Sequence, residues 1–318
     1  MAAAIETEAL TKDFSVGFWR PRPYRALDRL TLNVAAGEVF GCLGPNGAGK
    51  STTLKLLMQL LYPTSGAARI LGRPAGDVAV RQRTGFLAEN PYYYDHLTAE
   101  ELLSYFARLF GYRGAEVGTR VSRVLDDVGI GAERRMRLRR FSKGMIQRVG
   151  LAQALINDPE IVFLDEPMSG LDPLGRRHVR DIILGLRARG CTVFFSSHIL
   201  SDAEALCSRV GVLVQGRLVA SGPLSEILGF ELKGWELVLA GVGAGLRPDL
   251  DQVARRVTPL SDGHVMLHLA PDAEPDRLLG ELTRRGAHVV SLNPVRETLE
   301  DYFVQVVGAS GSRGPGGL

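Results

Sequence analysis

Residues 44–51 combine glycines with a lysine and a serine in a spacing that suits phosphate binding. The stretch reads Gly44-Pro45-Asn46-Gly47-Ala48-Gly49-Lys50-Ser51 and matches G-x-x-x-x-G-K-[ST]. Glycines allow successive backbone N–H groups to converge on phosphate oxygens at a helix N-terminus, where the helix dipole favours anions. Lys50 adds a mobile positive charge for the β- and γ-phosphates, and Ser51 offers a hydroxyl to Mg²⁺. The alternative, a chance glycine-rich turn, is disfavoured because an apolar run precedes the stretch and leucines at helical spacing follow it.

Carboxylates and a histidine follow two other apolar runs. Asp165 and Glu166 come directly after IVFL, and His198 follows CTVFFSS. Asp165 suits the Mg²⁺-binding acid of P-loop ATPases, and Glu166 beside it suits the polarisation of an attacking water. A surface turn for the two acids and a structural role for the histidine are the plainer alternatives. Because ligands bind at the carboxyl edge of open α/β sheets, we expect Gly44, Asp165 and His198 to meet at that edge.

The elements that must hold these residues alternate between strands and helices. Apolar runs without polar alternation, interleaved with helical patterns, indicate parallel strands that are buried on both faces. Leucines at helical spacing predict a helix from Lys50 to Tyr62. Residues 98–155 are dominated by helical patterns, and Thr98 followed by Glu101 predicts a capping box.

Both ends of the chain differ from this centre. Residues 5–40 read as strands separated by turns, with an exposed loop at 15–25 that is rich in proline and arginine. After about residue 230 the pattern is strand, helix, strand, strand, helix, strand, which fits a small ferredoxin-like unit. A last helix is predicted over ETLEDYFVQVV, before a tail that should be disordered. The predicted domains are 1–228 with a helical subdomain at about 90–155, then 229–307, then the tail at 308–318.

Composition places the chain among globular proteins with ample material for a core. Of its 318 residues 45% are hydrophobic and 23% charged, which excludes disordered, collagen-like and disulfide-scaffold classes. A net charge of +3 does not favour nucleic acid, and none is expected as a partner. Three cysteines without CxxC spacing indicate reduced thiols in a cytosolic protein. Because no signal-peptide pattern and no apolar run near ~20 residues is present, we expect other chains to supply any membrane-spanning part.

With these motifs in place, the region from about residue 4 to 228 resembles the ATP-binding subunits of ABC transporters. GPNGAGKST, which ends at Thr52, is similar to their Walker A loop, and IVFLDEP to Walker B with its catalytic glutamate. FSKGMIQR resembles the signature segment, SGLD the D-loop, and His198 the switch histidine. The matched residues are Ser142, Lys143, Gly144 and Met145 in the signature and Ser169, Gly170, Leu171 and Asp172 in the D-loop.

This resemblance implies an α/β fold of the P-loop NTPase type. The expected ATPase domain has a mixed, mainly parallel sheet, an N-terminal antiparallel β subdomain and a helical subdomain, followed by a small α+β domain. ATP and Mg²⁺ would be its ligands, and Phe14 is the best candidate for stacking on adenine, with Trp19 and Tyr24 as alternatives. The implied catalytic residues are Lys50, Glu166 and His198, the phosphate-binding residues Gly44 to Thr52, and the metal ligands Ser51, Asp165 and Glu89.

The resemblance also implies partners. Two copies would pack head to tail with two ATP molecules between them, so that Ser142 and Gly144 of one copy face the Walker residues of the other. ATP would close this homodimer, and hydrolysis would open it. A separate integral membrane permease would hold the dimer at the cytoplasmic face of the membrane.

Two departures from the family pattern affect the expected chemistry. Lys143 and Met145 stand where the signature usually has glycine and glutamine, and Lys143 could add charge toward phosphate. Glu89 stands where the family usually has the Q-loop glutamine. Its carboxylate can still meet Mg²⁺, since hard cations prefer oxygen ligands, but it also adds negative charge near the γ-phosphate.

Two further clusters have open interpretations. Tyr92, Tyr93 and Tyr94 follow Glu89 and either face the groove that receives a membrane subunit or pack locally. Arginines crowd ahead of the signature, where a solvated loop or dimer-edge cluster is favoured over a nucleic-acid patch. They are Arg134, Arg135, Arg137, Arg139 and Arg140.

The leading hypothesis is an ATPase subunit of an exporter, because the motif set is complete and the final 90 or so residues resemble the extension found on drug- and antibiotic-exporter subunits. The alternative is a soluble ABC ATPase acting on ribosomes or DNA, which one phosphate loop and the lack of a long heptad tract disfavour. A small-molecule kinase or GTPase does not account for the signature segment together with the D-loop.

Overall fold

The chain forms two compact units in a computed structural model. Their extents are Met1–Leu224 and Ser225–Leu318. The predicted domain boundary at residue 228 lies outside the described residues, as do the predicted tail and, apart from Asp301, the last predicted helix. The residues that the structure describes are 3–17, 19, 22–227, 232–242, 250, 252–296 and 301.

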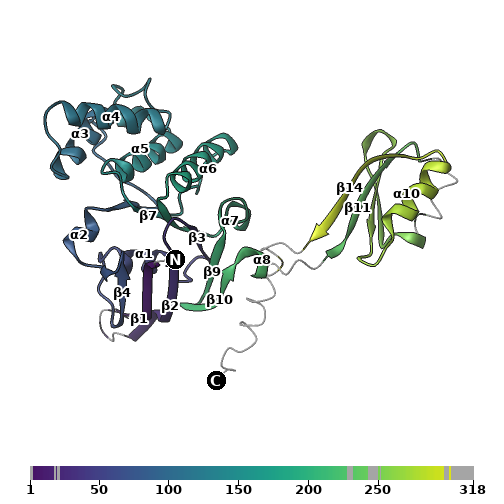
Figure 1. The fold of residues 1–318 in the computed structure, drawn as a ribbon, viewed down its shortest axis with the longest axis horizontal. Coiled ribbons are helices and arrows are strands. Elements are labelled where there is room, and N and C mark those ends of the chain that lie inside the picture. Colours follow the sequence, from purple (N-terminus) through teal and green to yellow (C-terminus); the bar gives the residue numbers. More distant parts are fainter. Residues whose placement is uncertain are drawn as a thin grey trace. The chain divides into compact units, whose positions relative to one another are not determined.

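A six-stranded sheet forms the centre of the first unit (Figure 1). Its strands are β3 (Val39–Leu43), β6 (Thr84–Leu87), β7 (Ile161–Asp165), β8 (Thr192–Ser197), β9 (Arg209–Val214) and β10 (Arg217–Pro223). They lie in the order β10-β9-β3-β8-β7-β6, and all but the antiparallel β10 are parallel. Every residue of β3, β7 and β8 is buried, as expected for apolar runs without polar alternation. The prediction of a mainly parallel α/β sheet is confirmed.

A second, antiparallel sheet is built from the first part of the chain. Its strands are β1 (Ala3–Val16), β2 (Arg22–Ala35), β4 (Ser65–Ile70) and β5 (Arg73–Pro74). The pairing of β1 with β2 continues to Val16 and Arg22, so the loop predicted over 15–25 is too long. Pro23 is tolerated within β2 because β2 is an edge strand of this sheet, where a missing N–H group need not break the ladder.

Helices cover the sheets and form a separate cluster. They are α1 (Lys50–Leu57), α2 (Val78–Arg81), α3 (Ala99–Leu109), α4 (Ala115–Asp127), α5 (Lys143–Leu155), α6 (Pro173–Ala188), α7 (Leu200–Leu206) and α8 (Leu224–Ile227). α1 contacts β2 and β4 of one sheet and β7 and β8 of the other, so its leucines join both sheets in one core. α3, α4 and α5 pack against one another, and the capping box predicted for Thr98 and Glu101 is present at the start of α3.

The first helix is shorter than the sequence predicted. It ends at Leu57 rather than Tyr62, because Gln59 adopts a left-handed backbone with φ 50°. The N–H groups of Leu60 and Leu61 both donate to Lys55 O, which closes the helix end. Leucine spacing alone does not report such a change in backbone conformation.

The second unit is a four-stranded antiparallel sheet with a helix. Its elements are β11 (Leu232–Ala240), β12 (Arg256–Pro259), β13 (Val265–Leu269), α10 (Pro275–Arg284) and β14 (His288–Arg296). The strand order β12-β13-β11-β14 is that of a ferredoxin-like unit, and the α+β fold predicted for this part is confirmed. Of the first helix predicted here, over DLDQVARR, residues Leu250, Gln252 and Val253 are helical and Arg256 already begins β12, while residues 249 and 251 lie outside the described ones. No helix in the described part of either unit is long and apolar enough to cross a membrane.

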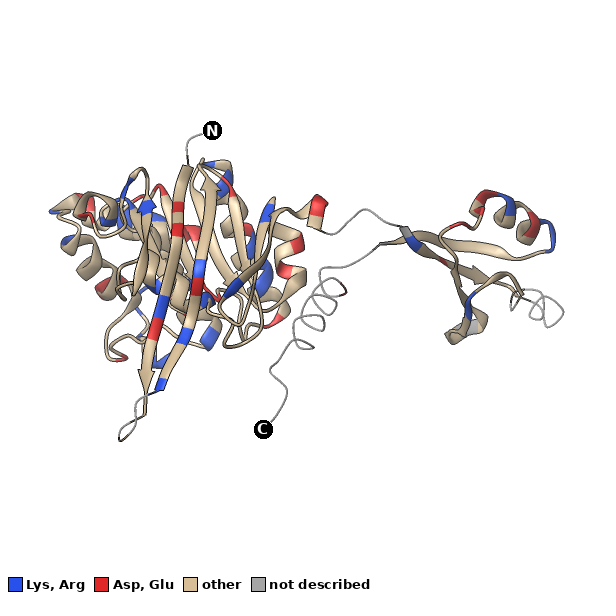
Figure 2. Cartoon of the chain, turned by 90° about the horizontal axis from the view of Figure 1, so that it is seen from below, with Lys and Arg blue, Asp and Glu red and all other residues tan. Residues whose placement is uncertain are grey.

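Lys and Arg residues are interspersed with Asp and Glu residues along the elements of both units (Figure 2). Within the arginine cluster ahead of the signature, Arg134 donates to Glu100 at 3.1 Å, and Arg135 lies 3.8 Å from the same carboxylate. Part of the positive charge of this cluster is therefore neutralised by Glu100 of α3.

The three cysteines are free, and burial raises the pKa of Cys42 and of Cys191 to about 12, which keeps both thiols protonated.

Gly85 of β6 supports a test of this packing, because a Cβ atom there would overlap Ala154 O of α5. We expect Gly85→Ala to lower the free energy of unfolding by about 1–3 kcal/mol, since the backbone must shift to relieve the overlap. Gly185→Ala in α6 is the matched control, because its Cβ would meet no atom of the described chain within 4 Å. The control should raise stability by about 0.5–1 kcal/mol. Equal destabilisation of both variants in urea unfolding would contradict the described contact.

Candidate nucleotide-binding site

The glycine-rich loop connects the end of β3 to the start of α1, as predicted, and neighbouring backbone fixes its path. A Cβ atom on Gly44 would overlap Leu213 O, and one on Gly49 would lie 2.6 Å from Ala26 O. Gly47 instead has a positive φ of 80° and open space where a Cβ would point. The first and last glycines are therefore required by packing, whereas Gly47 leaves one side of the loop accessible to a ligand.

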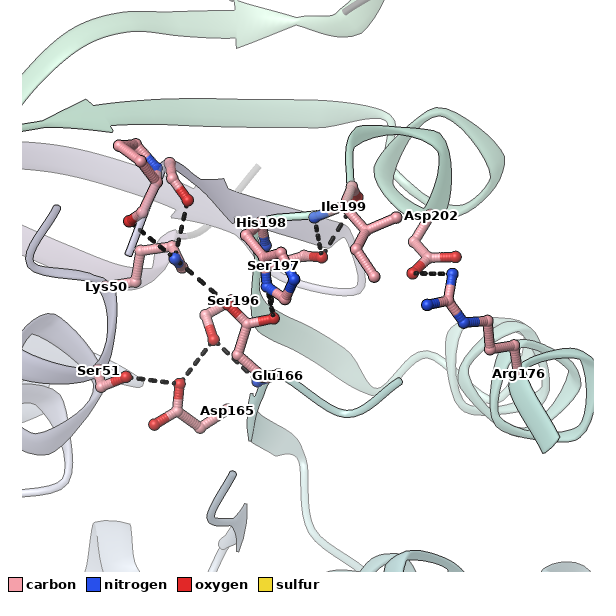
Figure 3. A network of polar contacts seen from close by, with 12 residues as sticks. Lys50, Ser51, Asp165, Glu166, Arg176, Ser196, Ser197, His198, Ile199 and Asp202 are labelled. Atoms are coloured by element: carbon pink, nitrogen blue, oxygen red, sulfur yellow. Dashed lines mark hydrogen bonds and ion pairs between the residues drawn. The ribbon is translucent and has the colours of Figure 1, made fainter. Parts of the chain in front are cut away.

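Lys50 is 5% exposed although it carries a charge. Its Nζ donates to Gly44 O at 2.8 Å and to Pro45 O at 3.1 Å, and it lies 3.2 Å from Glu166 Oε1 (Figure 3). A buried ammonium needs such partners, because its removal from water is otherwise costly. The lysine of the loop and the glutamate that follows β7 thus form a buried ion pair.

Asp165 and Glu166 occupy the carboxyl end of β7, and Ser196 of β8 connects them. Ser196 Oγ donates to Asp165 Oδ1 at 2.6 Å and accepts from the backbone N–H of Glu166 at 2.9 Å. Ser51 Oγ also donates to Asp165 Oδ1, at 3.0 Å. Ser196 was not predicted; its signal was a hydroxyl residue near the end of the apolar run that precedes the histidine.

The predicted switch histidine, His198, lies against the second carboxylate oxygen of Glu166. His198 Nδ1 is 2.8 Å from Glu166 Oε2. Glu166 has a left-handed backbone with φ 47°, an uncommon conformation for a residue with a Cβ atom. With Lys50 on one carboxylate oxygen and His198 on the other, the side chain of Glu166 is held from both sides.

A cavity of about 360 Å³ opens beside this network. Of the three candidate aromatic residues, Phe14 and Tyr24 line it, and they pair across β1 and β2. Trp19 is 90% exposed and does not line it. The lining residues are Phe14, Tyr24, Ala26, Asn46, Gly47, Ala48, Gly49, Lys50, Ser51, Thr52, Glu89 and Glu166.

The oxygen donors expected for a metal ion are partly assembled. The hydroxyl of Ser51 and the carboxylate of Asp165 are in contact, and Glu89 lines the same cavity. These hard oxygen donors fit Mg²⁺, which usually binds to one or two carboxylates together with substrate phosphates. Among the described residues, no group of three or more His, Cys, Asp or Glu side chains could hold a metal ion without such help.

The signature and D-loop residues meet each other but do not line this cavity. Ser142 caps α5 and accepts from Met145 N at 3.3 Å, and Asp172 caps α6 and accepts from Gly175 N at 2.7 Å. The side chain of Lys143 lies over Gly170, where a Cβ would be only 3.1 Å from Lys143 Cε.

Two buried or half-buried side chains, Gln147 and Tyr93, make further contacts of α5, and of these only Gln147 was not singled out in the sequence. Gln147 of α5 is buried and donates to Pro167 O at 3.1 Å, which ties the signature helix to the end of β7. Tyr93 donates to Gln153 of α5 at 3.2 Å, so this tyrosine packs locally. Tyr92 and Tyr94 are exposed, and the two interpretations of the tyrosine run therefore apply to different residues.

Comparisons with known proteins agree with this geometry. Residues 27–169 match the family model described as ABC transporter. The chain is 44% identical to an uncharacterised ABC transporter ATP-binding protein of Synechocystis over 96% of this chain and 84% of that protein. The chain belongs to the ABC transporter family. The expected ATP-binding cassette fold is thereby confirmed, and the protein is an ATP-binding subunit with the ATPase activity of that family.

Other relatives of this ABC subunit are named for transport or resistance. It is 33% identical to the bacitracin transport ATP-binding protein of Bacillus licheniformis, over 97% of this chain and 98% of that protein. It is also 33% identical to the daunorubicin/doxorubicin resistance ATP-binding protein of Streptomyces peucetius, over 96% of this chain and 92% of that protein. A solved dimeric ATP-binding cassette in a post-hydrolysis state with ADP and Pi is 27% identical, with a TM-score of 0.63, over 69% of this chain and 98% of that one. These relatives support a transporter subunit rather than a soluble ATPase acting on ribosomes.

Substitution of Lys50 tests the site, because Lys50 supplies the positive charge of the glycine-rich loop that lines the cavity. We expect Lys50→Ala to weaken ATP binding by well over tenfold, since the charge offered to the β- and γ-phosphates is lost. Lys55→Ala on the exposed side of the same helix is the matched control and should bind ATP within about twofold of the unchanged chain. Calorimetric titration of the nucleotide measures both. Unchanged affinity of Lys50→Ala would contradict the phosphate role.

Proposed function

We propose that this ABC subunit energises export through a separate membrane permease, at whose cytoplasmic face it is held. The observation that carries the ATPase part is the buried network that joins Lys50, Glu166 and His198 beside the cavity. The export part is supported by the relatives named for bacitracin transport and for daunorubicin/doxorubicin resistance, which match this chain in both of its units.

ATP would bind with its phosphates on the loop from Gly44 to Thr52. Backbone N–H groups at the start of α1 and the ammonium of Lys50 would hold the phosphate oxygens. Phe14 is the proposed adenine platform, and Tyr24 lies beside it in the pairing of β1 and β2. Ser51 and Asp165 would hold Mg²⁺, with Glu89 near it; the bound ion would neutralise charge on the β- and γ-phosphates.

Binding of the triphosphate would change the partner of Lys50 and so release the catalytic base. In the structure, Glu166 Oε1 faces the lysine and Oε2 faces His198. When the γ-phosphate takes over the ammonium, Glu166 remains held by His198 alone and can accept a proton from water. The water oxygen then attacks the γ-phosphorus, the bond to the bridging oxygen breaks, and ADP leaves with phosphate as the second product.

The active unit is proposed to be a head-to-tail homodimer. Because Ser142, Lys143, Gly144 and Met145 do not line their own chain's cavity, they are available to the ATP of a second copy. The N-terminus of α5 would present its N–H groups to that γ-phosphate, and the D-loop residues Ser169 and Asp172 would lie beside it. A dimeric solved cassette among the relatives supports this assembly.

Glu166→Gln tests the catalytic role. The amide keeps the shape of the side chain but cannot accept the proton of water, so we expect turnover to fall by at least about 100-fold with ATP binding retained. ATP should then accumulate in a stable dimer, which size-exclusion chromatography with light scattering detects. Glu160→Gln, an exposed carboxylate just before β7 that pairs with Arg83, is the control and should hydrolyse ATP normally. Rapid hydrolysis by Glu166→Gln would remove this residue from the mechanism.

The metal role of Ser51 gives a separate prediction. We expect EDTA to abolish hydrolysis and added Mg²⁺ to restore it, because the phosphate charge is otherwise not neutralised. Ser51→Ala should raise the Mg²⁺ concentration for half-maximal activity by about 10-fold or more. Ser65→Ala on an exposed strand position should not change it. An identical Mg²⁺ dependence of Ser51→Ala and the unchanged chain would contradict the assignment.

A further inference from the structure

A buried carboxylate lies between the two helices that follow the D-loop and the switch histidine. Asp202 of α7 is only 2% exposed. Arg176 and Arg180, four residues apart on one face of α6, point toward it (Figure 3 shows Arg176). Because α6 begins after Asp172 and α7 begins two residues after His198, this contact joins the continuations of two motifs.

The contact is unusually loose for a buried ion pair. The shortest separations are 3.9 Å from Arg176 Nη1 to Asp202 Oδ2 and 3.8 Å from Arg180 Nη2 to Asp202 Oδ1. Hydrogen bonds between arginine and carboxylate are about 2.7–2.9 Å long. Accordingly, Asp202 Oδ2 and Arg180 Nε are buried without a hydrogen-bond partner in the described part of the chain.

Some exposed pairs of the same chemistry are tighter, since Arg25 lies 2.8 Å from Asp13 and Arg217 lies 2.8 Å from Asp28. Other exposed pairs are as loose, such as Arg277 and Glu274 at 4.0 Å, but water solvates their charges. Burial should favour close contact, because an unpaired charge away from water is costly whereas an exposed one is solvated. At the buried Asp202, by contrast, α6 and α7 stand too far apart to complete the hydrogen bonds that a buried carboxylate needs.

Asp202 interacts electrostatically with Glu166 and His198. Burial raises the pKa of its carboxyl, Arg176 and Arg180 lower it, and Glu166 raises it while His198 lowers it further. The connection from His198 to α7 is the single residue Ile199, whose N–H donates to Ser197 Oγ at 2.9 Å and whose carbonyl oxygen accepts from it at 3.2 Å. So short and hydrogen-bonded a connection favours the transmission of an α7 displacement to His198.

We propose that Asp202, Arg176 and Arg180 form a positioning cluster for ATP hydrolysis, in which α6 closes on α7 by about 1 Å when ATP is bound and so keeps His198 in its 2.8 Å contact with Glu166. The proposal rests on the proposed ATPase mechanism. Closure converts both loose ion pairs into charge-assisted hydrogen bonds and gives the buried atoms of the cluster their partners. The same movement of α6 also displaces the D-loop, because the D-loop residue Asp172 caps the N-terminus of α6.

Asp202→Asn tests the cluster, since the amide keeps the size of the side chain but loses the charge that draws both arginines. In the full chain purified with its membrane subunit, we expect kcat to fall about 10-fold while KM and the ATP dissociation constant stay within about twofold. The melting temperature should not fall, because ion pairs of 3.8–3.9 Å with unpartnered buried atoms contribute little to stability. A merely structural role would instead lower the melting temperature and weaken ATP binding together with the rate.

Matched variants distinguish the proposed positioning role of the cluster from a merely structural one. Asp202→Glu reaches farther toward α6 and should recover at least about a third of the rate. Arg176→Gln should lower kcat as Asp202→Asn does, and the double variant should be no slower than either single one. Arg177→Gln, on the exposed side of the same helix, should leave kcat unchanged. If Asp202→Asn does not fold, Arg176→Gln and Arg180→Gln alter the half-buried partners of the cluster and answer the same question.

Two results would overturn the cluster. One is an unchanged kcat in folded Asp202→Asn, Arg176→Gln and Arg180→Gln; the other is an additive loss in the double variant. Failure of the ATPase proposal would look different, because the unchanged chain would then not hydrolyse ATP in complex with its membrane subunit.

Discussion

The site depends on one buried ion pair. Lys50 and Glu166 lie 3.2 Å apart with almost no exposure to solvent, and each would be costly to bury alone. Two backbone carbonyls complete the surroundings of the ammonium, and His198 completes those of the carboxylate. The pair explains how the charge of Lys50 can be buried in the protein. In the proposed mechanism, ligand entry would be a change of partners, since the phosphate that binds Lys50 would take the place of the Glu166 carboxylate.

The parallel sheet is what makes this convergence possible. The glycine loop, the two acids and the histidine follow β3, β7 and β8, which are adjacent in the order β3-β8-β7. Segments more than a hundred residues apart therefore deliver side chains to one edge, as in the 3.0 Å contact of Ser51 with Asp165. Because all three strands are buried along their whole length, this edge cannot move without disturbing the core. Conformational changes at the site must therefore involve the helices that follow these strands, which are α1, α6 and α7.

The sequence predicted most of what depends on residue type and short spacing. The three apolar runs, the glycine loop and the capping box of α3 each have local causes, and all were found where predicted. The end of α1 was missed because it depends on the left-handed backbone of Gln59, and the extent of the β1–β2 hairpin because cross-strand pairing outweighs the proline there. Ser196 and Gln147 could not be assigned, because a hydroxyl and an amide gain their roles only from neighbours distant in sequence.

The departures from the family pattern acquire a physical meaning in three dimensions. A glycine at position 143 could not lie across Gly170, whereas the lysine side chain covers it and adds a contact between the signature helix and the D-loop of the same chain. Gln147 adds a second tie, from that helix to the end of β7. If the signature of one copy meets the ATP of the other, as proposed, a displacement of α5 would be transmitted through these two contacts. It would reach the D-loop and the end of β7 in the copy to which that α5 belongs. The D-loop in turn continues into α6, whose arginines face Asp202 beside the switch histidine. In the proposed dimer, these contacts would connect the partner's nucleotide to Glu166 within one subunit. The separations of 3.8–3.9 Å at Asp202 are the step of that connection at which a closer approach of α6 and α7 would change the contacts most.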